Sequence, residues 1–323
     1  MNTTVEQLRR EVELQLNRIG FSETPARLYD PVRYMLALGG KRMRPVLVLL
    51  ANRMFGGNEQ QAMPAALAVE VFHNFTLLHD DIMDKAPLRR GQATVHEKWN
   101  PDIAILSGDA MFVKSCQLMM ASPSAAMPAV MNLFLQTALE VCEGQQLDMD
   151  FEHSAEVRIE EYLDMIRLKT AVLLGASLGI GAALAGASAE ATGHVYDFGV
   201  NLGVAFQLQD DILDVYGDAD KFGKQVGGDI LANKKTFLLL TALEKAEGTL
   251  RDQLLYWLQE PASDEKVQGV KAVYAGLKVR EAALTKMESL YQAALDHLEA
   301  LPLSAEQTQP LRELAAMLMA REN

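Results

Sequence analysis

The sequence predicts an all-α protein. Apolar residues recur at helical spacing along nearly the whole chain, and the sequence lacks alternating strand-like runs bounded by Asn-Gly or Asp-Gly turns. Hydrophobic residues make up 49% of its 323 residues, which is enough for a sizeable core. Composition does not change abruptly and no Pro-, Gly- or Ser-rich linker interrupts the chain. By length and composition one large domain is as likely as two, and we take residues 1–323 as a single domain.

The expected helices follow from this periodicity and from the residues that end them. Gly39 and Gly40 end the second helix, Pro64 suits the first turn of the fourth, Pro87 prevents its continuation and Gly217 closes the eighth. In chain order the expected helices cover residues 4–19, 26–38, 45–54, 63–84, 101–121, 126–150, 158–187, 190–216, 233–245, 249–259, 264–274, 277–299 and 304–321.

One segment has the length of a membrane span. Thr170 to Ala189 carries no charged residue. Its residues are mostly Gly, Ala and Ser, which let helices approach closely, so we expect a buried interior helix and not an integral membrane protein.

Charge and cysteine content narrow the class and the location. The formal net charge of −13 argues against a nucleic-acid partner, because phosphate backbones are bound mainly by Lys and Arg. Cys116 and Cys142 lie in apolar helical contexts without a CxxC partner, which predicts buried, reduced thiols and a cytoplasmic location. The first fifteen residues lack the apolar core of a signal peptide.

Two acidic clusters have the same spacing. DDIMD spans Asp80 to Asp84 and DDILD spans Asp210 to Asp214, each after a long apolar helix. Residues four apart share a helix face, so the first and last aspartates of each cluster stack, while the second is rotated to the side. The macrodipole disfavours an acid in the last turn by about 0.3–1 kcal/mol. The clusters therefore predict a compensating cation, and oxygen-only ligands indicate a hard ion such as Mg²⁺.

Basic residues supply the opposite charge. GGKRMRP places Lys41, Arg42 and Arg44 beyond a double glycine, and Arg89 and Arg90 follow the first acidic cluster. Arg grips phosphate with a planar fork and Lys as a point charge, so these residues predict sites for multiply charged phosphate groups. Mg²⁺, phosphate and long apolar helices together predict an amphiphilic substrate, with a diphosphate head and an apolar tail between helices. Further basic positions are Lys169, Lys224, Lys234 and Lys235.

In these acidic clusters and basic residues, and over almost its full length, the sequence resembles the trans-isoprenyl diphosphate synthases, the polyprenyl synthetase family. The resemblance implies the isoprenoid synthase fold, a bundle of ten or more helices around a central cavity, with the two aspartate motifs facing each other across its mouth, in a homodimer. The matching motifs, in chain order from Gly39 to Thr236, are GGKRMRP, HNFTLLHDDIMD, RRGQATVH, ILSGDAMF, EGQQLD, LKT, FQLQDDILD, and GKQVGGD followed by NKKT.

The resemblance also implies roles for individual residues. Three Mg²⁺ ions per active site would be held by Asp80, Asp84 and Asp210, while Asp81, Asp211 and Asp214 act through waters or hold these ligands in place. The allylic diphosphate would be contacted by Arg89, Lys169, Lys224 and Lys234, with Gln207 and Thr170 nearby. The diphosphate of isopentenyl diphosphate would be bound by Lys41, Arg44, His73 and Arg90.

The implied reaction is the Mg²⁺-dependent head-to-tail condensation of isopentenyl diphosphate with allylic diphosphates. Basic residues and Mg²⁺ stabilise the departing diphosphate and leave an allylic carbocation. The double bond of isopentenyl diphosphate attacks this cation, and a proton then leaves. Oxygens of Thr170 and Gln207 stabilise the cation without capturing it, and exclusion of water protects it.

Residues just before the first aspartate motif are expected to set the product length. Phe75 and Thr76 lie five and four residues before Asp80, about 6 to 8 Å below it at the helical rise. Helical geometry leaves the choice open, and the family resemblance favours Phe75 as the floor. A single aromatic residue there resembles short-chain enzymes, and we expect a twenty-carbon product in preference to a fifteen-carbon one. The other candidate floor is Met111 or Phe112 on the next motif helix.

Other protein classes share part of this pattern. A terpene cyclase would use the same ionisation in an all-α fold, but it pairs one aspartate-rich motif with an Asn/Ser/Glu-type second site, unlike DDILD. A metal phosphohydrolase of the HD type is suggested by His79 and Asp80 with His73 nearby, and it leaves Asp84 and the second cluster unexplained. A non-catalytic binding module is disfavoured because such relatives usually lose one aspartate motif.

Overall fold

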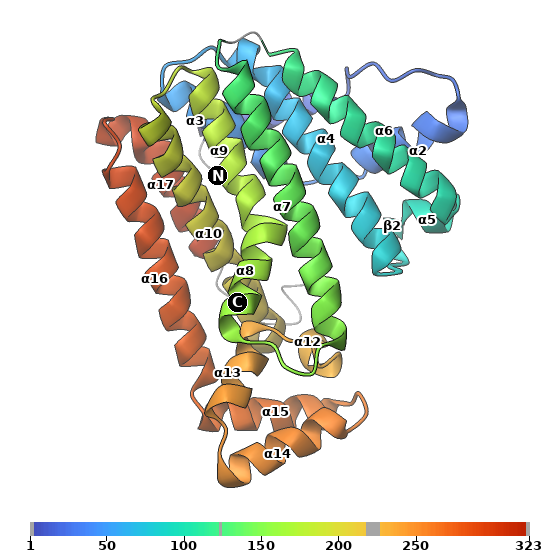
Figure 1. The fold of residues 1–323 in the computed structure, drawn as a ribbon, viewed down its shortest axis with the longest axis vertical. Coiled ribbons are helices and arrows are strands. Elements are labelled where there is room, and N and C mark those ends of the chain that lie inside the picture. The colour runs from blue at the N-terminus through green and yellow to red at the C-terminus, as the bar shows by residue number, and fades with distance from the viewer. Residues whose placement is uncertain (1–2, 123–124, 218–226, 321–323) are drawn as a thin grey trace. The chain divides into compact units, whose positions relative to one another are not determined.

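A computed structural model describes residues 3–122, 125–217 and 227–320 (Figure 1). Over these residues the regular secondary structure is helical apart from one two-stranded hairpin, formed by β1 (Leu88–Arg89) and β2 (Gln92–Ala93). This confirms the all-α class. The helices are α1 (Thr3–Leu16), α2 (Ala26–Ala37), α3 (Met43–Met54), α4 (Glu59–Met83), α5 (Val95–Lys98), α6 (Pro101–Met120), α7 (Met127–His153), α8 (Ile159–Ile166), α9 (Val172–Leu184), α10 (Ala189–Tyr216), α12 (Gly228–Leu231), α13 (Phe237–Lys245), α14 (Gly248–Gln259), α15 (Asp264–Gly276), α16 (Val279–Glu299) and α17 (Ala305–Met319), with a π-helical segment, η1 (Arg167–Ala171).

The chain divides into two compact units, each with its own core. Unit 1 comprises Met1–Phe134, Ser177–Gly193 and Leu303–Pro310. Unit 2 comprises Leu135–Ala176, His194–Pro302 and Leu311–Asn323. The boundaries between the units fall within α7, α9, α10 and α17.

Unit 1 is organised around α4. This helix packs against α3 and α6, which lies beside it in Figure 1, and α2 packs against α6 in turn. Asn58 begins α4, because its side chain accepts hydrogen bonds from the backbone N–H groups of Gln60 and Gln61. The core of the unit is formed by residues that include Val32, Met35, Val71, Leu78, Ala104 and Met111.

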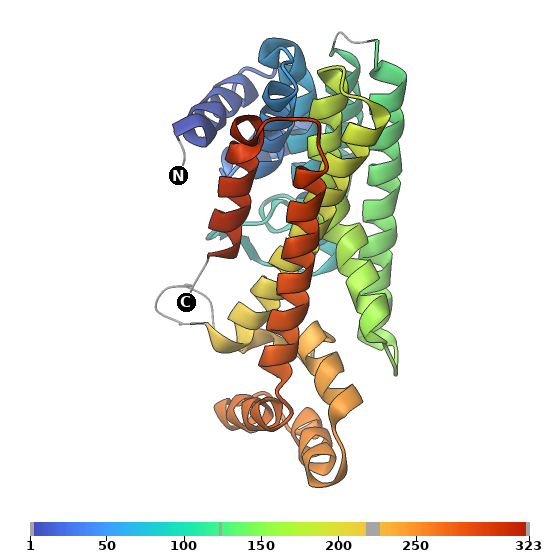
Figure 2. The ribbon, with the colours of Figure 1, turned by 90° about the vertical axis from the view of Figure 1, so that its left-hand side faces the viewer.

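Unit 2 holds most of α10 and the C-terminal helices. Helix α13 packs against α8, α15 and α16, and α14 packs against α15. Figure 2 shows the orange pair α14 and α15 at one end of the long helix α16. The core of the unit includes Tyr162, Leu208, Ile212, Leu238, Leu254 and Tyr274.

The bounds of the expected helices agree with the observed ones to within about four residues, with three corrections, and the short helices α5 and α12 were not predicted. The predicted helix 158–187 is divided into α8, η1 and α9. Pro64 lies inside α4 and not in its first turn, because the Asn58 cap starts the helix earlier. The hairpin was not predicted, since each of its strands has only two residues and its turn carries Arg90 and Gly91, both at positive φ, in place of Asn-Gly.

The interior helix is confirmed, and the expected burial of both thiols is wrong. Two helical stretches, Pro101–Met120 and Ile159–Leu184, are long and apolar enough to cross a membrane by length and composition, and 78% of the second is buried within the protein. Both cysteines are free, but Cys116 is only half-buried and Cys142 is exposed. Apolar neighbours in the sequence did not imply burial, because α6 and α7 also carry exposed apolar side chains.

Candidate functional site

The first aspartate cluster ends α4 in unit 1. Asp84 is the C-cap of the helix, so the cluster lies in the last turn as expected. Asp81 is 2% exposed, and its two carboxylate oxygens accept hydrogen bonds from Arg89 Nε at 2.9 and 2.8 Å. Asp80 is half-buried and Asp84 is exposed. The three carboxylates therefore divide into one that is bonded inside the protein and two nearer solvent.

The hairpin after α4 directs two neighbouring arginines to different partners. Arg89 lies on β1 opposite Gln92 and bonds to Asp81. Arg90 lies in the turn with φ 54°, and its guanidinium donates a hydrogen bond to the carbonyl of Gly39. A Cβ on Gly40 would lie 3.0 Å from that guanidinium, which explains the glycine at this position.

The second aspartate cluster lies near the end of α10 in unit 2. Asp211 is 5% exposed and accepts a hydrogen bond from Tyr162 Oη at 2.5 Å. Burial raises the pKa of Asp211 to about 7, although hydrogen bonds from Tyr162 and Gln207 and the charge of Lys234 oppose the shift. Asp210 is half-buried. The second aspartate is thus the buried, protein-bonded member here as well.

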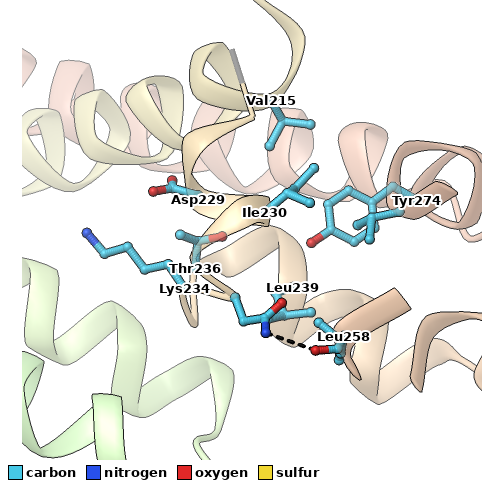
Figure 3. A pocket seen from close by; sticks show the side chains of 10 residues that line it. Val215, Asp229, Ile230, Lys234, Thr236, Leu239, Leu258 and Tyr274 are labelled. Carbon is cyan, nitrogen blue, oxygen red and sulfur yellow. Dashed lines mark hydrogen bonds between the residues drawn. The ribbon is translucent and has the colours of Figure 1, made fainter. Parts of the chain in front are cut away.

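Asp214 connects α10 to α12 in the same unit. Its Oδ2 accepts a hydrogen bond from the backbone N–H of Asp229 at 2.9 Å, and its carbonyl accepts one from Gly227 at 2.6 Å. Lys234 follows α12, and its backbone N–H donates to the Asp229 carbonyl at 2.8 Å. Figure 3 shows the side chains of Asp229 and Lys234 extending to the same side, away from the buried Tyr274. The water-sized cavity of about 10 Å³ between them and Tyr274 is too small for a substrate.

The π-helical segment η1 presents Lys169 and Thr170. Lys169 Nζ bonds to Asp148 Oδ2 of α7 at 2.6 Å, and both side chains are about one quarter exposed. Gly144 of α7 lies so close that a Cβ there would be 2.2 Å from the Lys169 backbone nitrogen. A π-helical turn inside a longer helix is often found at functional sites. The sequence did not reveal this turn, because its hydrophobic pattern continues through it.

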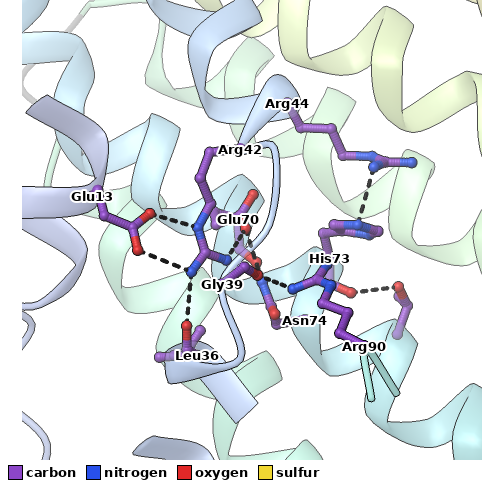
Figure 4. Close-up of polar contacts among 10 residues, drawn as sticks. Glu13, Leu36, Gly39, Arg42, Arg44, Glu70, His73, Asn74 and Arg90 are labelled. Carbon is purple, nitrogen blue, oxygen red and sulfur yellow. Dashed lines mark hydrogen bonds and ion pairs between the residues drawn. The ribbon is translucent and has the colours of Figure 1, made fainter. Parts of the chain in front are cut away.

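The GGKRMRP loop joins α2 to α3 in unit 1 (Figure 4). Arg44 Nη1 lies 3.0 Å from His73 Nε2 of α4. Burial lowers the pKa of Arg44 to about 10 and, together with the charges of Arg44 and Arg90, lowers the pKa of His73 well below its usual value. His73 is therefore neutral at physiological pH. The Nε atom of Arg44 is buried without a hydrogen-bond partner among the described residues.

Two further lysines were predicted to bind diphosphate. Lys41 is exposed in the same loop. Lys224 lies outside the described residues.

The predicted chain-length residues lie in an aromatic cluster of unit 1. The ring of Phe75 lies 5.5 Å from that of Phe112 and 4.7 Å from the imidazole of His79, measured between centroids. Thr76 Oγ1 donates a hydrogen bond to the carbonyl of His73 at 2.8 Å. Met111 is fully buried. The two candidate floor residues Phe75 and Phe112 are therefore direct neighbours and not separate alternatives.

Sequence reasoning missed several residues that bond to the predicted site residues within each unit. Tyr162, Asp148 and Glu70 each bond to a predicted site residue or its neighbour, from 21 to 49 residues away. Arg42 was noted only as a basic residue, and it is buried. Only for Arg42 did the sequence hold a clue to its structural role. Arg42 and Arg44 are two residues apart at the start of a helix, so their side chains point to opposite sides and do not both face one ligand.

The chain is similar to a family model and to proteins named as prenyl diphosphate synthases. Residues 25–277 match the model of the polyprenyl synthetase family. The chain is 38% identical over 277 residues to a geranylgeranyl diphosphate synthase of Sulfolobus acidocaldarius, and the match covers 84% of each chain. It is 35% identical over 323 residues of alignment to a geranylfarnesyl diphosphate synthase of Natronomonas pharaonis, which covers 93% of this chain and 91% of that one.

Solved structures extend the similarity to the fold. A geranylgeranyl pyrophosphate synthase matches with a TM-score of 0.93 and 44% identity over 100% of both chains. A polyprenyl synthase from Caulobacter crescentus, complexed with calcium and isoprenyl diphosphate, matches with a TM-score of 0.84 and 27% identity, over 99% of this chain and 98% of that one.

Proposed function

Because this chain belongs to the polyprenyl synthetase family, we propose that it is a trans-prenyltransferase that condenses isopentenyl diphosphate with allylic diphosphates. The proposed product is a twenty-carbon prenyl diphosphate, in line with the names of its relatives, one of which is named for the next longer product. The observation that carries the proposal is the shared division within both aspartate clusters. Asp81 and Asp211 are buried and bonded to the protein, whereas Asp80 and Asp210 lie nearer solvent.

Asp80, Asp84 and Asp210 are the residues we assign to Mg²⁺. Among residues 3–122, 125–217 and 227–320, no three His, Cys, Asp or Glu side chains form a ready-made metal site. This fits Mg²⁺, which binds through one or two carboxylates and completes its octahedron with waters and substrate phosphates. When bound, three such ions would neutralise the charge that develops on the departing diphosphate. The calcium in the Caulobacter crescentus neighbour is consistent with a divalent ion here.

Basic side chains divide between the two proposed diphosphates. Arg89, Lys169 and Lys234 serve the allylic diphosphate together with Lys224. Each described member lies beside an aspartate: Arg89 at Asp81, Lys169 at Asp148, and Lys234 near Asp211. Such pairing keeps the ammonium and guanidinium groups fixed in position before substrate arrives.

The second diphosphate, that of isopentenyl diphosphate, is assigned to a separate group of residues. Arg44 offers its Nε, which lacks a partner among the described residues, and neutral His73 adds a ring that can donate one N–H to the anion. The exposed Lys41 and the turn residue Arg90 complete the group. Because Arg89 and Arg90 bond in different directions, one hairpin supplies one cation to each diphosphate.

The carbocation step is assigned to uncharged oxygens near Lys169. Thr170 lies in η1, where helical hydrogen bonding is irregular, and Gln207 donates to Asp211 from α10. A hydroxyl and an amide oxygen can face the cation as dipoles without forming a bond to it. The basic residues hold the leaving diphosphate. This diphosphate then accepts the proton that the condensation product loses as its new double bond forms.

We further propose a cytoplasmic homodimer. On α6, the exposed residues Leu106, Val113 and Met120 are seven apart and are 56–67% exposed. Apolar side chains at this spacing form one stripe along a helix, and exposed stripes of this kind mark association surfaces. Two free cysteines suit a reducing compartment.

The HD-phosphohydrolase interpretation finds no support in the geometry of His79. Its ring packs edge-on against Phe75, and its Nε2 lies 3.2 Å from the carbonyl oxygen of Ile105. A Cβ on Gly108 would lie 2.2 Å from that nitrogen, so the imidazole fills a space that glycine leaves open. His79 thus serves helix packing between α4 and α6.

A product assay tests the proposed function. The chain is incubated with isopentenyl diphosphate, Mg²⁺ and allylic primers of five, ten and fifteen carbons, and the products are sized by chromatography. We expect elongation to twenty carbons, with loss of activity when EDTA removes Mg²⁺. Asp80→Asn and Asp210→Asn should each reduce kcat by more than the about 100-fold loss typical of outer-shell partners of a metal. Asp252→Asn, at an exposed position on α14, is the matched control. Failure to elongate any primer would refute the proposal.

A further inference from the structure

Arg42 and Arg44 lie two residues apart in one loop and have opposite environments. Arg42 is 3% exposed and adopts a left-handed backbone conformation with φ 51° at the start of α3. A non-glycine residue rarely holds this conformation unless surrounding contacts impose it. The Nε of Arg44 has no partner among the described residues, whereas the guanidinium of Arg42 is bonded on three sides.

The partners of Arg42 come from three helices (Figure 4). Its Nε and Nη2 donate to the carboxylate of Glu13 on α1 at 2.9 and 3.4 Å, a forked ion pair. Its Nη1 donates to Glu70 of α4 at 2.7 Å, and Nη2 also donates to the carbonyl of Leu36 at the end of α2, at 2.7 Å. These bonds use four of the five N–H donors of the guanidinium and compensate its buried charge from within the protein, so Arg42 is a structural residue of the loop and not a phosphate ligand.

The bonds continue from Arg42 toward the proposed isopentenyl diphosphate site. Asn74 Nδ2 donates to the Glu70 carboxylate at 3.0 Å and to its carbonyl at 2.8 Å. His73, which contacts Arg44, lies between these two residues on α4. We call Arg42 with its partners Glu13, Glu70 and Leu36 the clamp. The clamp fixes the loop that carries Arg44 against the helical turn that carries His73.

We propose that Arg42 is a positioning residue for the isopentenyl diphosphate site and that Glu13 makes α1 a working part of that site. This inference rests on the proposed function. Helix α1 lies outside residues 25–277, the part that matches the family model, so the contribution of Glu13 is a property of this chain beyond that match. Without Glu13, one face of the Arg42 guanidinium lacks its carboxylate, and the loop loses its tie to α1.

Glu13→Gln is the decisive variant, because the Glu13 side chain is 41% exposed and the substitution removes its charge while keeping its size. A glutamine can accept one bond from Arg42, but its amide N–H₂ faces the other guanidinium donor. We expect KM for isopentenyl diphosphate to rise about tenfold, with kcat and KM for the allylic primer within about twofold of wild type. Glu11→Gln removes the same charge from an exposed position on α1, where it contacts only Gln15 among the described side chains, and should behave as wild type.

Hydrogen exchange gives a second readout that does not depend on activity. Backbone amides of residues 39–44 should exchange faster in Glu13→Gln than in Glu11→Gln. Equal KM values for isopentenyl diphosphate in the two variants would overturn the inference, and so would an equal rise in both substrates' KM, which indicates general disturbance. The double variant Glu13→Gln/Arg42→Lys should have no higher KM for isopentenyl diphosphate than Arg42→Lys alone, because both changes break the same clamp.

Failure of the proposed function has a different signature. If wild type elongates no primer, calorimetry with inorganic diphosphate replaces the kinetic assay. Weaker diphosphate binding in Glu13→Gln than in Glu11→Gln would then still support the clamp, and equal or absent binding in both variants would overturn it.

Discussion

At the scale of single residues, the site depends on which partner each charged side chain already has. Asp81 is bonded to Arg89 and Asp211 to Tyr162, and on the proposed function both hold the neighbouring ligands in place. His73 is held neutral by burial and by nearby guanidinium groups, first of all Arg44. A neutral imidazole preserves the positive field of Arg44 without adding a second charge that would have to be solvated.

The depressed pKa of His73 predicts a pH-dependent stability. The unfolded state binds a proton as pH falls below about 6.5, whereas the folded state does not, so the contribution of His73 is present above that pH and is lost below it. Between pH 7.5 and 5.5 the loss approaches about 1.4 kcal/mol. Urea unfolding of wild type and His73→Gln at both pH values measures it, since glutamine does not titrate. Equal pH dependence in the two proteins would contradict this prediction.

The contact between Phe75 and Phe112 predicts that both rings limit product length. We expect Phe75→Ala to lengthen the main product by at least one isoprene unit, and Phe112→Ala to do so as well, because each removes one side of the same aromatic contact. The double variant should give the longest products. Tyr256→Ala, at an exposed aromatic residue on α14, is the control and should leave the product unchanged. Unchanged chain length in both single variants would show that the floor lies elsewhere.

At the scale of elements, η1 is held by the close approach of α7. Gly144 faces the backbone of Leu168 and Lys169, where a Cβ would lie 2.2 to 2.7 Å from main-chain atoms. Main-chain atoms of a buried segment cannot move aside as a flexible side chain can. The position of Lys169, and with it the ion pair with Asp148, therefore depends on a glycine at residue 144.

Gly144→Ala should displace η1 and reduce both stability and activity. We expect a loss of about 1–3 kcal/mol in the free energy of unfolding, the usual cost of overpacking, and a lower kcat. Gly193→Ala is the matched control, because Gly193 is also helical and a Cβ there meets nothing within 4 Å. It should be neutral or stabilising by up to about 1 kcal/mol. Equal effects of the two substitutions in thermal unfolding and in the condensation assay would refute the role assigned to Gly144.

The same elements show what the sequence could and could not predict. Helical periodicity and capping residues located the long helices, since these signals are local. The turn at η1 was not predicted, because the hydrophobic pattern continues through it and the close approach of Gly144 comes from about 25 residues earlier in the chain. The bonds of Asp211 to Tyr162 and of Arg42 to Glu13 join residues 49 and 29 positions apart, and only the folded chain brings them together. Motif spacing therefore pointed to the candidate ligands, whereas the residues that bond to their neighbours could be found only from the folded chain.

At the scale of the whole molecule, the exposed apolar side chains on two helices raise the question of association. Besides the stripe on α6, the unit 2 part of α7 exposes Leu135, Leu139, Cys142 and Met149, spaced four, three and seven residues apart. Spacings that sum to seven keep these side chains on one face of the helix. Exposed apolar stripes of this kind are candidate association surfaces.

A charge placed in either stripe should therefore dissociate the proposed homodimer. Leu106→Lys on α6 and Leu139→Lys on α7 would each put an ammonium group into the proposed apolar contact, where it would lose its hydration without a partner. We expect sedimentation velocity at micromolar concentration to show a dimer for wild type and a monomer for each variant. Leu284→Lys, at a 38% exposed leucine on α16, is the matched control and should remain dimeric. A monomeric wild type, or dimeric stripe variants, would show that these apolar faces have another role.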